Sequence, residues 1–120
     1  MNIETVKKHA QEWIEAWNQK NIEGIMIHYA DDVEFAAITV TKRWDIPNGI
    51  LNGKAALKKH FLKGIELAPT LKFELVDVLV APDSFGILYK RETGAFVTDI
   101  ITFDENNNVK TAKAFYGTMP

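Results

Sequence analysis

Apolar side chains recur at helical spacing over residues 1–20. Charged side chains take most of the opposite side, which is the pattern of an amphipathic helix packed on a core. The side chain of Asn2 is suited to cap this helix, and we expect the helix to end near Lys20. Its predicted buried stripe consists of Val6, Ala10, Trp13, Ile14 and Trp17.

The pattern then changes from helical to extended. Asn21 is a second capping residue and predicts a short helix that closes at residues 30–32. β-Branched and aromatic residues dominate residues 33–41, which favours a strand. Residues 42–52 contain a proline and a glycine, so we expect an irregular loop that could lie over a pocket. The apolar side of the short helix would carry Ile22, Ile25, Met26 and Tyr29.

The second half of the chain predicts one more helix and four strands. Residues 54–67 carry Leu57, Phe61 and Ile65 at intervals of four, which places them on one helix face. The strands are expected over residues 71–80, 85–91, 95–103 and 109–116. Helices followed by an antiparallel meander indicate an α+β fold, with three helices on one face of a curved sheet. The length of 120 residues indicates a single domain, residues 1–120.

One predicted strand places a carboxylate among apolar side chains. Strand side chains alternate between the two faces, so Asp99 shares its face with Val97, Ile101 and Phe103. A buried carboxyl group either finds a partner or keeps its proton, because ionising it away from water is costly. Asp99 is therefore the leading candidate for chemistry. The alternative is a structural carboxylate that is hydrogen-bonded to a side chain such as Arg91, Tyr29 or Tyr116, or to backbone at a bulge.

Composition excludes several classes of function. The net charge is -2, which gives no general attraction to nucleic acid or anionic lipid. The chain has no cysteine, and its single serine, Ser84, falls in a predicted turn. Its glycines form no phosphate-binding fingerprint, and its histidines lack metal-ligand spacing, so we expect no cofactor and no metal. The first residues read as neither signal peptide nor membrane anchor, so a cytoplasmic location is expected.

Three stretches of the chain together resemble the NTF2-like or SnoaL-like superfamily. They are AWNQKNIEGIMIHYADDVEF, NGKAALKKHF and TDIITFDENNNVKTAKAFYG. The resemblance implies a cone-shaped (cystatin-like) fold whose helices cover a pocket lined by a bent sheet. This superfamily includes isomerases, dehydratases, epoxide hydrolases, polyketide cyclases and non-catalytic binding or association modules. It also implies a homodimer formed through the outer sheet face, where we expect Phe96, Ile100, Val76 and Val78.

Ketosteroid isomerases use an aspartate base, a tyrosine and a protonated aspartic acid. By resemblance, the protonated acid falls on Asp99, the tyrosine on Trp13, and the base on Ala37 or its neighbours. Because two of these three groups are missing, steroid isomerisation by that mechanism is not expected. Polyketide cyclases, which can work from one pocket aspartate, are the closer analogy.

His60 is the candidate partner of Asp99 in proton transfer, since a neutral imidazole is the usual base near pH 7. The alternative is a boundary histidine flanked by lysines. Lys42, Arg43 and Trp44 could cap an acidic ligand or form a solvated loop. The aromatic residues expected to line the pocket, as well as the core, are Trp13, Trp17, Tyr29, Phe35, Phe61 and Tyr116.

The sequence therefore predicts a protein that binds a small apolar molecule bearing oxygen. Any turnover would be cofactor-independent isomerisation, cyclisation or dehydration, with Asp99 as the acid and His60 as its partner. The competing hypothesis is a non-catalytic ligand-binding or dimerisation module of the same superfamily.

Overall fold

The computed structural model describes residues 1–119, which form four helices and six strands. The helices are α1 (Ile3–Asn18), α2 (Ile22–Met26), α3 (Ile38–Trp44) and α4 (Lys54–Leu67). The strands are β1 (Tyr29–Ala36), β2 (Ile50–Asn52), β3 (Glu74–Val80), β4 (Phe85–Lys90), β5 (Phe96–Phe103) and β6 (Val109–Tyr116).

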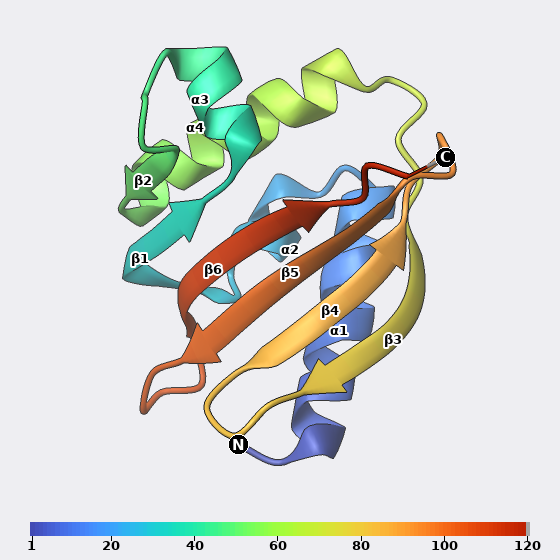
Figure 1. Ribbon diagram of the computed structural model, residues 1–120. Helices are drawn as coiled ribbons and strands as arrows, with labels where there is room; N and C mark the ends of the chain where they lie inside the picture. The colour runs from blue at the N-terminus through green and yellow to red at the C-terminus, as the bar shows by residue number, and fades with distance from the viewer. Residues whose placement is uncertain (120) are drawn as a thin grey trace.

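All six strands belong to one curved sheet with the order β2-β1-β6-β5-β4-β3 (Figure 1). β1 and β6 run parallel, whereas every other neighbouring pair is antiparallel. The predicted α+β fold and its mostly antiparallel sheet are confirmed. β6 lies between β1 and β5 and pairs with both, so it connects the first strand to the later antiparallel strands.

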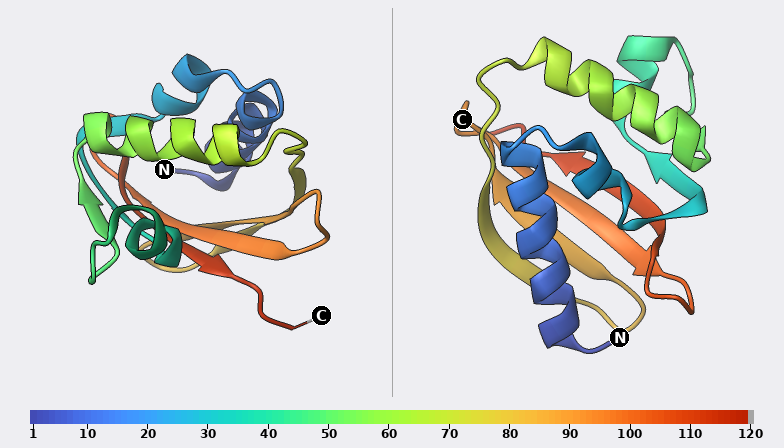
Figure 2. Two further views of the ribbon diagram at one scale, coloured as in Figure 1. Left: turned by 90° about the horizontal axis from the view of Figure 1, so that it is seen from above. Right: turned by 180° about the vertical axis from the view of Figure 1, so that it is seen from behind.

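Helices α1, α2 and α4 lie on the same side of the sheet (Figure 2). The core fills the space between these helices and the inner sheet face, and it contains the whole stripe predicted for α1. Asn2 caps α1 as predicted, because its side chain accepts a hydrogen bond from the Thr5 backbone N–H at 2.9 Å. At the other end, Asn18 exchanges two hydrogen bonds with the backbone of Phe73, which ties α1 to the segment before β3.

The structure corrects the prediction for residues 33–52. The strand expected over residues 33–41 begins earlier, at Tyr29, and ends at Ala36, so Tyr29 lies on β1 and not on the short helix. The end of the expected strand and the start of the expected irregular loop form α3 instead, and the last residues of the expected loop form β2. α3 forms despite the β-branched residues 39–41, because it buries Val40 completely, and tertiary packing outweighs intrinsic preference.

The turn between β5 and β6 follows the predicted chemistry. Asn107 has a left-handed backbone with φ of 62°, which asparagine tolerates better than most residues. The Asp104 carboxylate accepts hydrogen bonds from the backbone N–H groups of Asn106 and Asn108, at 2.9 and 3.0 Å. The predicted hairpin is confirmed.

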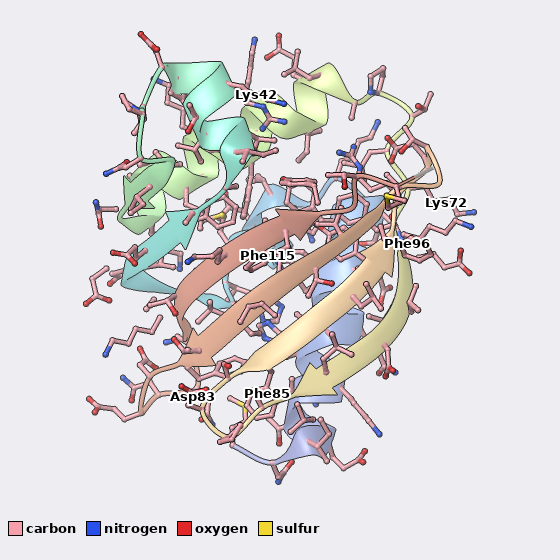
Figure 3. The ribbon with its side chains drawn as sticks, viewed as in Figure 1. Lys42, Lys72, Asp83, Phe85, Phe96 and Phe115 are labelled. Atoms are coloured by element: carbon pink, nitrogen blue, oxygen red, sulfur yellow. The ribbon has the colours of Figure 1, made fainter. Side chains whose placement is uncertain are left out.

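The outer sheet face carries apolar side chains that no helix in Figure 2 covers. Phe96 and Phe115, both labelled in Figure 3, are 50% and 53% exposed, and Leu79 is 40% exposed. Val78 was predicted on this face, but it packs against the core. The reason is a register shift in β3 between Leu75 and Asp77. Side chains after the shift point to the face opposite to the one that simple alternation predicts.

Among residues 1–119, no helix combines the length and the apolar character needed to cross a membrane.

Candidate functional site

A cavity of about 60 Å³ lies between the helices and the inner sheet face. It brings together all the predicted site residues except Tyr29, although they come from five different elements. Tyr29 is buried beside the cavity, where its hydroxyl accepts a hydrogen bond from Trp13 Nε1 at 2.9 Å. The predicted residues in the lining are Trp13, Trp17, Phe35, His60, Phe61, Asp99 and Tyr116.

Asp99 lines this cavity from β5 and is only 3% exposed. Its partner among the described residues is Tyr89 on β4, whose hydroxyl donates to Oδ1 over 3.4 Å. Burial raises the pKa of Asp99 to about 7, and the hydrogen bond from Tyr89 acts in the opposite direction. A carboxyl group with this pKa exchanges its proton near neutral pH, as a general acid or base must.

His60 lines the cavity from α4 and is held through both ring nitrogens. Trp44 Nε1 donates to His60 Nδ1 at 2.9 Å, so the proton of the neutral imidazole sits on Nε2. That nitrogen lies 3.2 Å from Thr39 Oγ1. Burial lowers the pKa of His60 to about 4, and the charge of Arg43 lowers it further. His60 is therefore a neutral side chain at pH 7 that connects α3 to α4.

Two arginines complete the polar part of the lining. Arg43 on α3 places Nη1 3.4 Å from the His60 carbonyl oxygen and 3.5 Å from His60 Nε2. Within residues 1–119 no carboxylate lies within 4.0 Å of its guanidinium. Arg91 follows β4, pairs with Glu92 at 3.1 Å and lies over the Phe73 ring, 5.5 Å from its centre.

Aromatic rings form the apolar wall of the cavity. The Trp17 ring packs against those of Phe61 and Phe73, with centroid distances of 4.9 and 5.3 Å. Tyr89 packs on Phe73 at 4.6 Å. The cavity thus combines an apolar wall, one carboxyl group and two guanidinium groups. This is the composition of a small-molecule site, apolar with a few placed polar groups.

The sequence of residues 10–109 matches the model of the SnoaL-like domain. That match spans most of the chain and decides the family. The chain belongs to the SnoaL-like domain family. No curated protein matches this SnoaL-like protein.

Solved structures share the fold over almost the full length of the chain. A SnoaL-like protein of unknown function from Burkholderia thailandensis E264 is 27% identical, with a TM-score of 0.92 and coverage of 98% of both chains. A protein of unknown function with a cystatin-like fold from Methylobium petroleophilum PM1 is 11% identical, with a TM-score of 0.75. The alignment covers 100% of this chain and 80% of that one. TerC, co-crystallised with polyporic acid, is 14% identical with a TM-score of 0.72, over 91% of this chain and 89% of that one.

Sequence reasoning missed two polar residues in the site of this SnoaL-like protein, Tyr89 and Thr39. Tyr89, not Arg91, Tyr29 or Tyr116, donates to Asp99 within the described part of the chain. The signal was available, because alternation along β4 puts Tyr89 on the same face as buried Ile87. Thr39 had no such signal, since it lies on the unpredicted α3. Arg91, named from the sequence as a possible partner of Asp99, lines the cavity but pairs with Glu92.

No group of three or more histidine, aspartate or glutamate side chains in residues 1–119 is arranged to hold a metal ion.

Proposed function

We propose that this SnoaL-like protein binds a small apolar molecule bearing oxygen, and that Asp99 exchanges a proton with it. The reaction would be a cofactor-independent isomerisation, cyclisation or dehydration. The supporting observation is the environment of Asp99, a carboxyl group that lines an aromatic cavity and has a pKa raised by burial to about 7. At that pKa both the acid and the carboxylate are populated near neutral pH.

In this proposal the protonated Asp99 donates a hydrogen bond to a carbonyl oxygen of the ligand. Negative charge that develops on that oxygen during proton abstraction is then stabilised by the donor. Alternatively, the carboxylate form accepts a proton from the carbon next to the carbonyl group. Tyr89 orients the Asp99 carboxyl group through its hydroxyl, so Tyr89 is a positioning residue.

His60 is the second candidate for proton transfer. Its Nδ1 lone pair accepts from Trp44, and its Nε2 faces Thr39, so it would have to release one of these contacts to act as a base. A role in holding Arg43 and Thr39 at the cavity requires no such change. We therefore propose His60 as a positioning residue first and as a proton-transfer partner second.

One observation favours the second candidate function, a non-catalytic module. The cavity of about 60 Å³ is small, because the aromatic side chains fill most of the space between the helices and the sheet. The exposed apolar outer face, with Phe96, Phe115 and Leu79, supports association with a second copy of the chain. We propose that this protein forms a homodimer through that face, whether or not it is an enzyme.

The test of the binding function compares wild type with Asp99→Asn, and Asp31→Asn, at an exposed position on β1, serves as the control. Acetophenone and related carbonyl compounds are titrated between pH 5 and 9 and followed by NMR. Affinity in wild type should fall as the pH rises through the pKa of Asp99, about 7, because the donor loses its proton. Affinity in Asp99→Asn should be independent of pH. Binding that is absent from wild type, or that has the same pH profile in both proteins, would contradict the proposal.

Catalysis has its own readout. Incubation of the bound carbonyl compounds in D₂O should exchange hydrogens on the carbon next to the carbonyl group faster with wild type than without protein, and Asp99→Asn should lose this exchange. If binding follows the expected pH profile but no exchange occurs, the non-catalytic module is the correct function.

A further inference from the structure

Buried donors without acceptors indicate what the cavity accepts. Over residues 1–119, two buried side-chain polar atoms have no hydrogen-bond partner, Trp17 Nε1 and Arg91 Nε. Both residues line the same cavity, and both atoms are N–H donors. Buried polar groups are nearly always paired, so the expected occupant supplies hydrogen-bond acceptors.

The charges around the cavity point the same way. Arg43 and Arg91 carry fixed positive charges, whereas His60, Tyr89 and Tyr116 are neutral at pH 7 because burial lowers the pKa of the histidine and raises those of the tyrosines. Asp99 contributes at most one negative charge to the cavity lining. Glu92 pairs with Arg91, but Arg43 has no acidic partner among the described residues. The cavity therefore has excess positive charge on the side of α3.

Arg43 also has the geometry to bind an anion. Its hydrogen bond in the described chain joins Nη1 to the His60 carbonyl oxygen, which leaves Nη2 and Nε free for a two-point contact with a carboxylate. Gly64 on α4 makes room for this group, since a Cβ at that position would lie 3.2 Å from Nη1. The contact of Nη1 with His60 thus fixes the guanidinium at the cavity without using the rest of it.

We propose that the ligand is a small carboxylic acid with an apolar body, whose carboxylate is bound by Arg43 and Arg91. The apolar body lies against Trp17, Phe61 and Phe73, and Trp17 Nε1 donates to an oxygen of the ligand. This inference rests on the proposed binding function and names its ligand class. A site of this kind should prefer carboxylic acids to neutral carbonyl compounds.

The test uses matched pairs of an acid and its neutral amide. Benzoate and benzamide, phenylacetate and phenylacetamide, and hexanoate and hexanamide are titrated at pH 6 and low ionic strength, with tryptophan fluorescence as the signal. At this pH the acids are ionised, whereas Asp99, with a pKa of about 7, is mostly protonated. Wild type should bind at least one acid about tenfold more tightly than its amide, since a desolvated two-point ion pair is worth more than a neutral hydrogen bond.

Three variants locate the effect. Arg43→Gln and Arg91→Gln should each weaken acid binding about tenfold and weaken amide binding much less, because the amide carries no charge. Lys42→Gln removes the same charge from the neighbouring, exposed position on α3 (Figure 3) and should bind the acids like wild type. Circular dichroism establishes that each variant folds. The wild-type comparison of acid with amide needs no variant, so the inference stays testable if Arg43→Gln does not fold.

The outcomes separate this inference from the proposed function. Equal binding of acids and amides, or equal losses in Lys42→Gln and Arg43→Gln, would overturn the anion site. If neutral carbonyl compounds bind with the Asp99-dependent pH profile and no acid binds, the ligand class is wrong and the proposed function stands. If neither acids nor neutral compounds bind, both fail.

Discussion

Asp99 is buried and its carboxyl group makes one hydrogen bond within residues 1–119, and this environment determines its effect on stability. Its pKa is raised from 3.8 to about 7, so the folded state holds a proton that the unfolded state loses between these values. Stability contributed by the neutral carboxyl group is therefore present below pH 3.8 and is lost as the pH rises to about 7. His9 and His60 act in the opposite direction, because their pKa values are lowered to about 3 and about 4 and stability is lost as the pH falls below 6.5.

We predict that Asp99→Asn stabilises the protein above pH 7. The amide cannot ionise, so the variant avoids a penalty of about 4 kcal/mol at most, at 1.36 kcal/mol per unit of pKa shift. Urea denaturation from pH 4 to pH 8 measures the difference between the two proteins. The histidine contributions cancel in that difference. A difference that does not change with pH would show that Asp99 ionises normally.

Tyr89 should tune the proton affinity of Asp99. We predict that Tyr89→Phe raises the pKa of Asp99 above its wild-type value by about one unit, since the variant removes the one hydrogen bond that favours the carboxylate. Tyr116→Phe is the matched control, because it removes a hydroxyl from the cavity lining that makes no hydrogen bond to Asp99 within the described residues. Carbon-13 NMR of the carboxyl group gives the pKa. Equal effects of the two variants would contradict a specific role for Tyr89.

At the scale of elements, the connection between α3 and β2 depends on one glycine. Gly49 has φ of +68°, and a Cβ there would lie 2.9 Å from the Ala37 carbonyl oxygen. The Gly49 carbonyl in turn accepts from the Ala37 backbone N–H at 3.0 Å. This contact closes the segment that places Thr39 and Arg43 at the cavity.

We predict that Gly49→Ala destabilises the protein by about 2 kcal/mol or more, since the new methyl group meets backbone that cannot move aside. Gly94→Ala is the control, with a similar φ of +87° but nothing within 4 Å of the new Cβ. It should cost about 1 kcal/mol, the strain of the backbone alone. Urea denaturation measures both, and equal losses would show that the Ala37 contact has no effect.

The elements with strong local periodicity could be predicted, and those that depend on packing could not. α1, α4 and the meander carry their patterns in the sequence, and alternation along β5 was enough to identify Asp99 as inward-facing. α3 could not be predicted, because residues 39–41 favour a strand and only burial of Val40 explains the helix. Arg43 and Arg91 lie far apart in the sequence, so their meeting at one cavity required the tertiary structure.

At the scale of the whole molecule, the bare outer sheet face predicts self-association. We expect wild type to be a dimer at micromolar concentration and Phe115→Lys to be a folded monomer, because a lysine in the centre of an apolar interface is left without a partner. Leu67→Lys on α4 is the control, since Leu67 is similarly exposed, at 58%, but lies on a helix. Light scattering coupled to size exclusion gives the masses. A monomeric wild type, or a monomeric Leu67→Lys, would contradict an interface on the sheet.

The position of β6 between β1 and β5 has a consequence for how the protein is made. During synthesis β1 leaves the ribosome long before its parallel neighbour exists, and only β2 can pair with it in the meantime. β1 and β2 have no hydrogen-bonded strand in common with β3, β4 and β5 until residues 109–116 emerge, so completion of the sheet must wait until translation has passed them. Nascent chains stalled before residues 109–116 emerge should bind chaperones and should be digested readily by proteases.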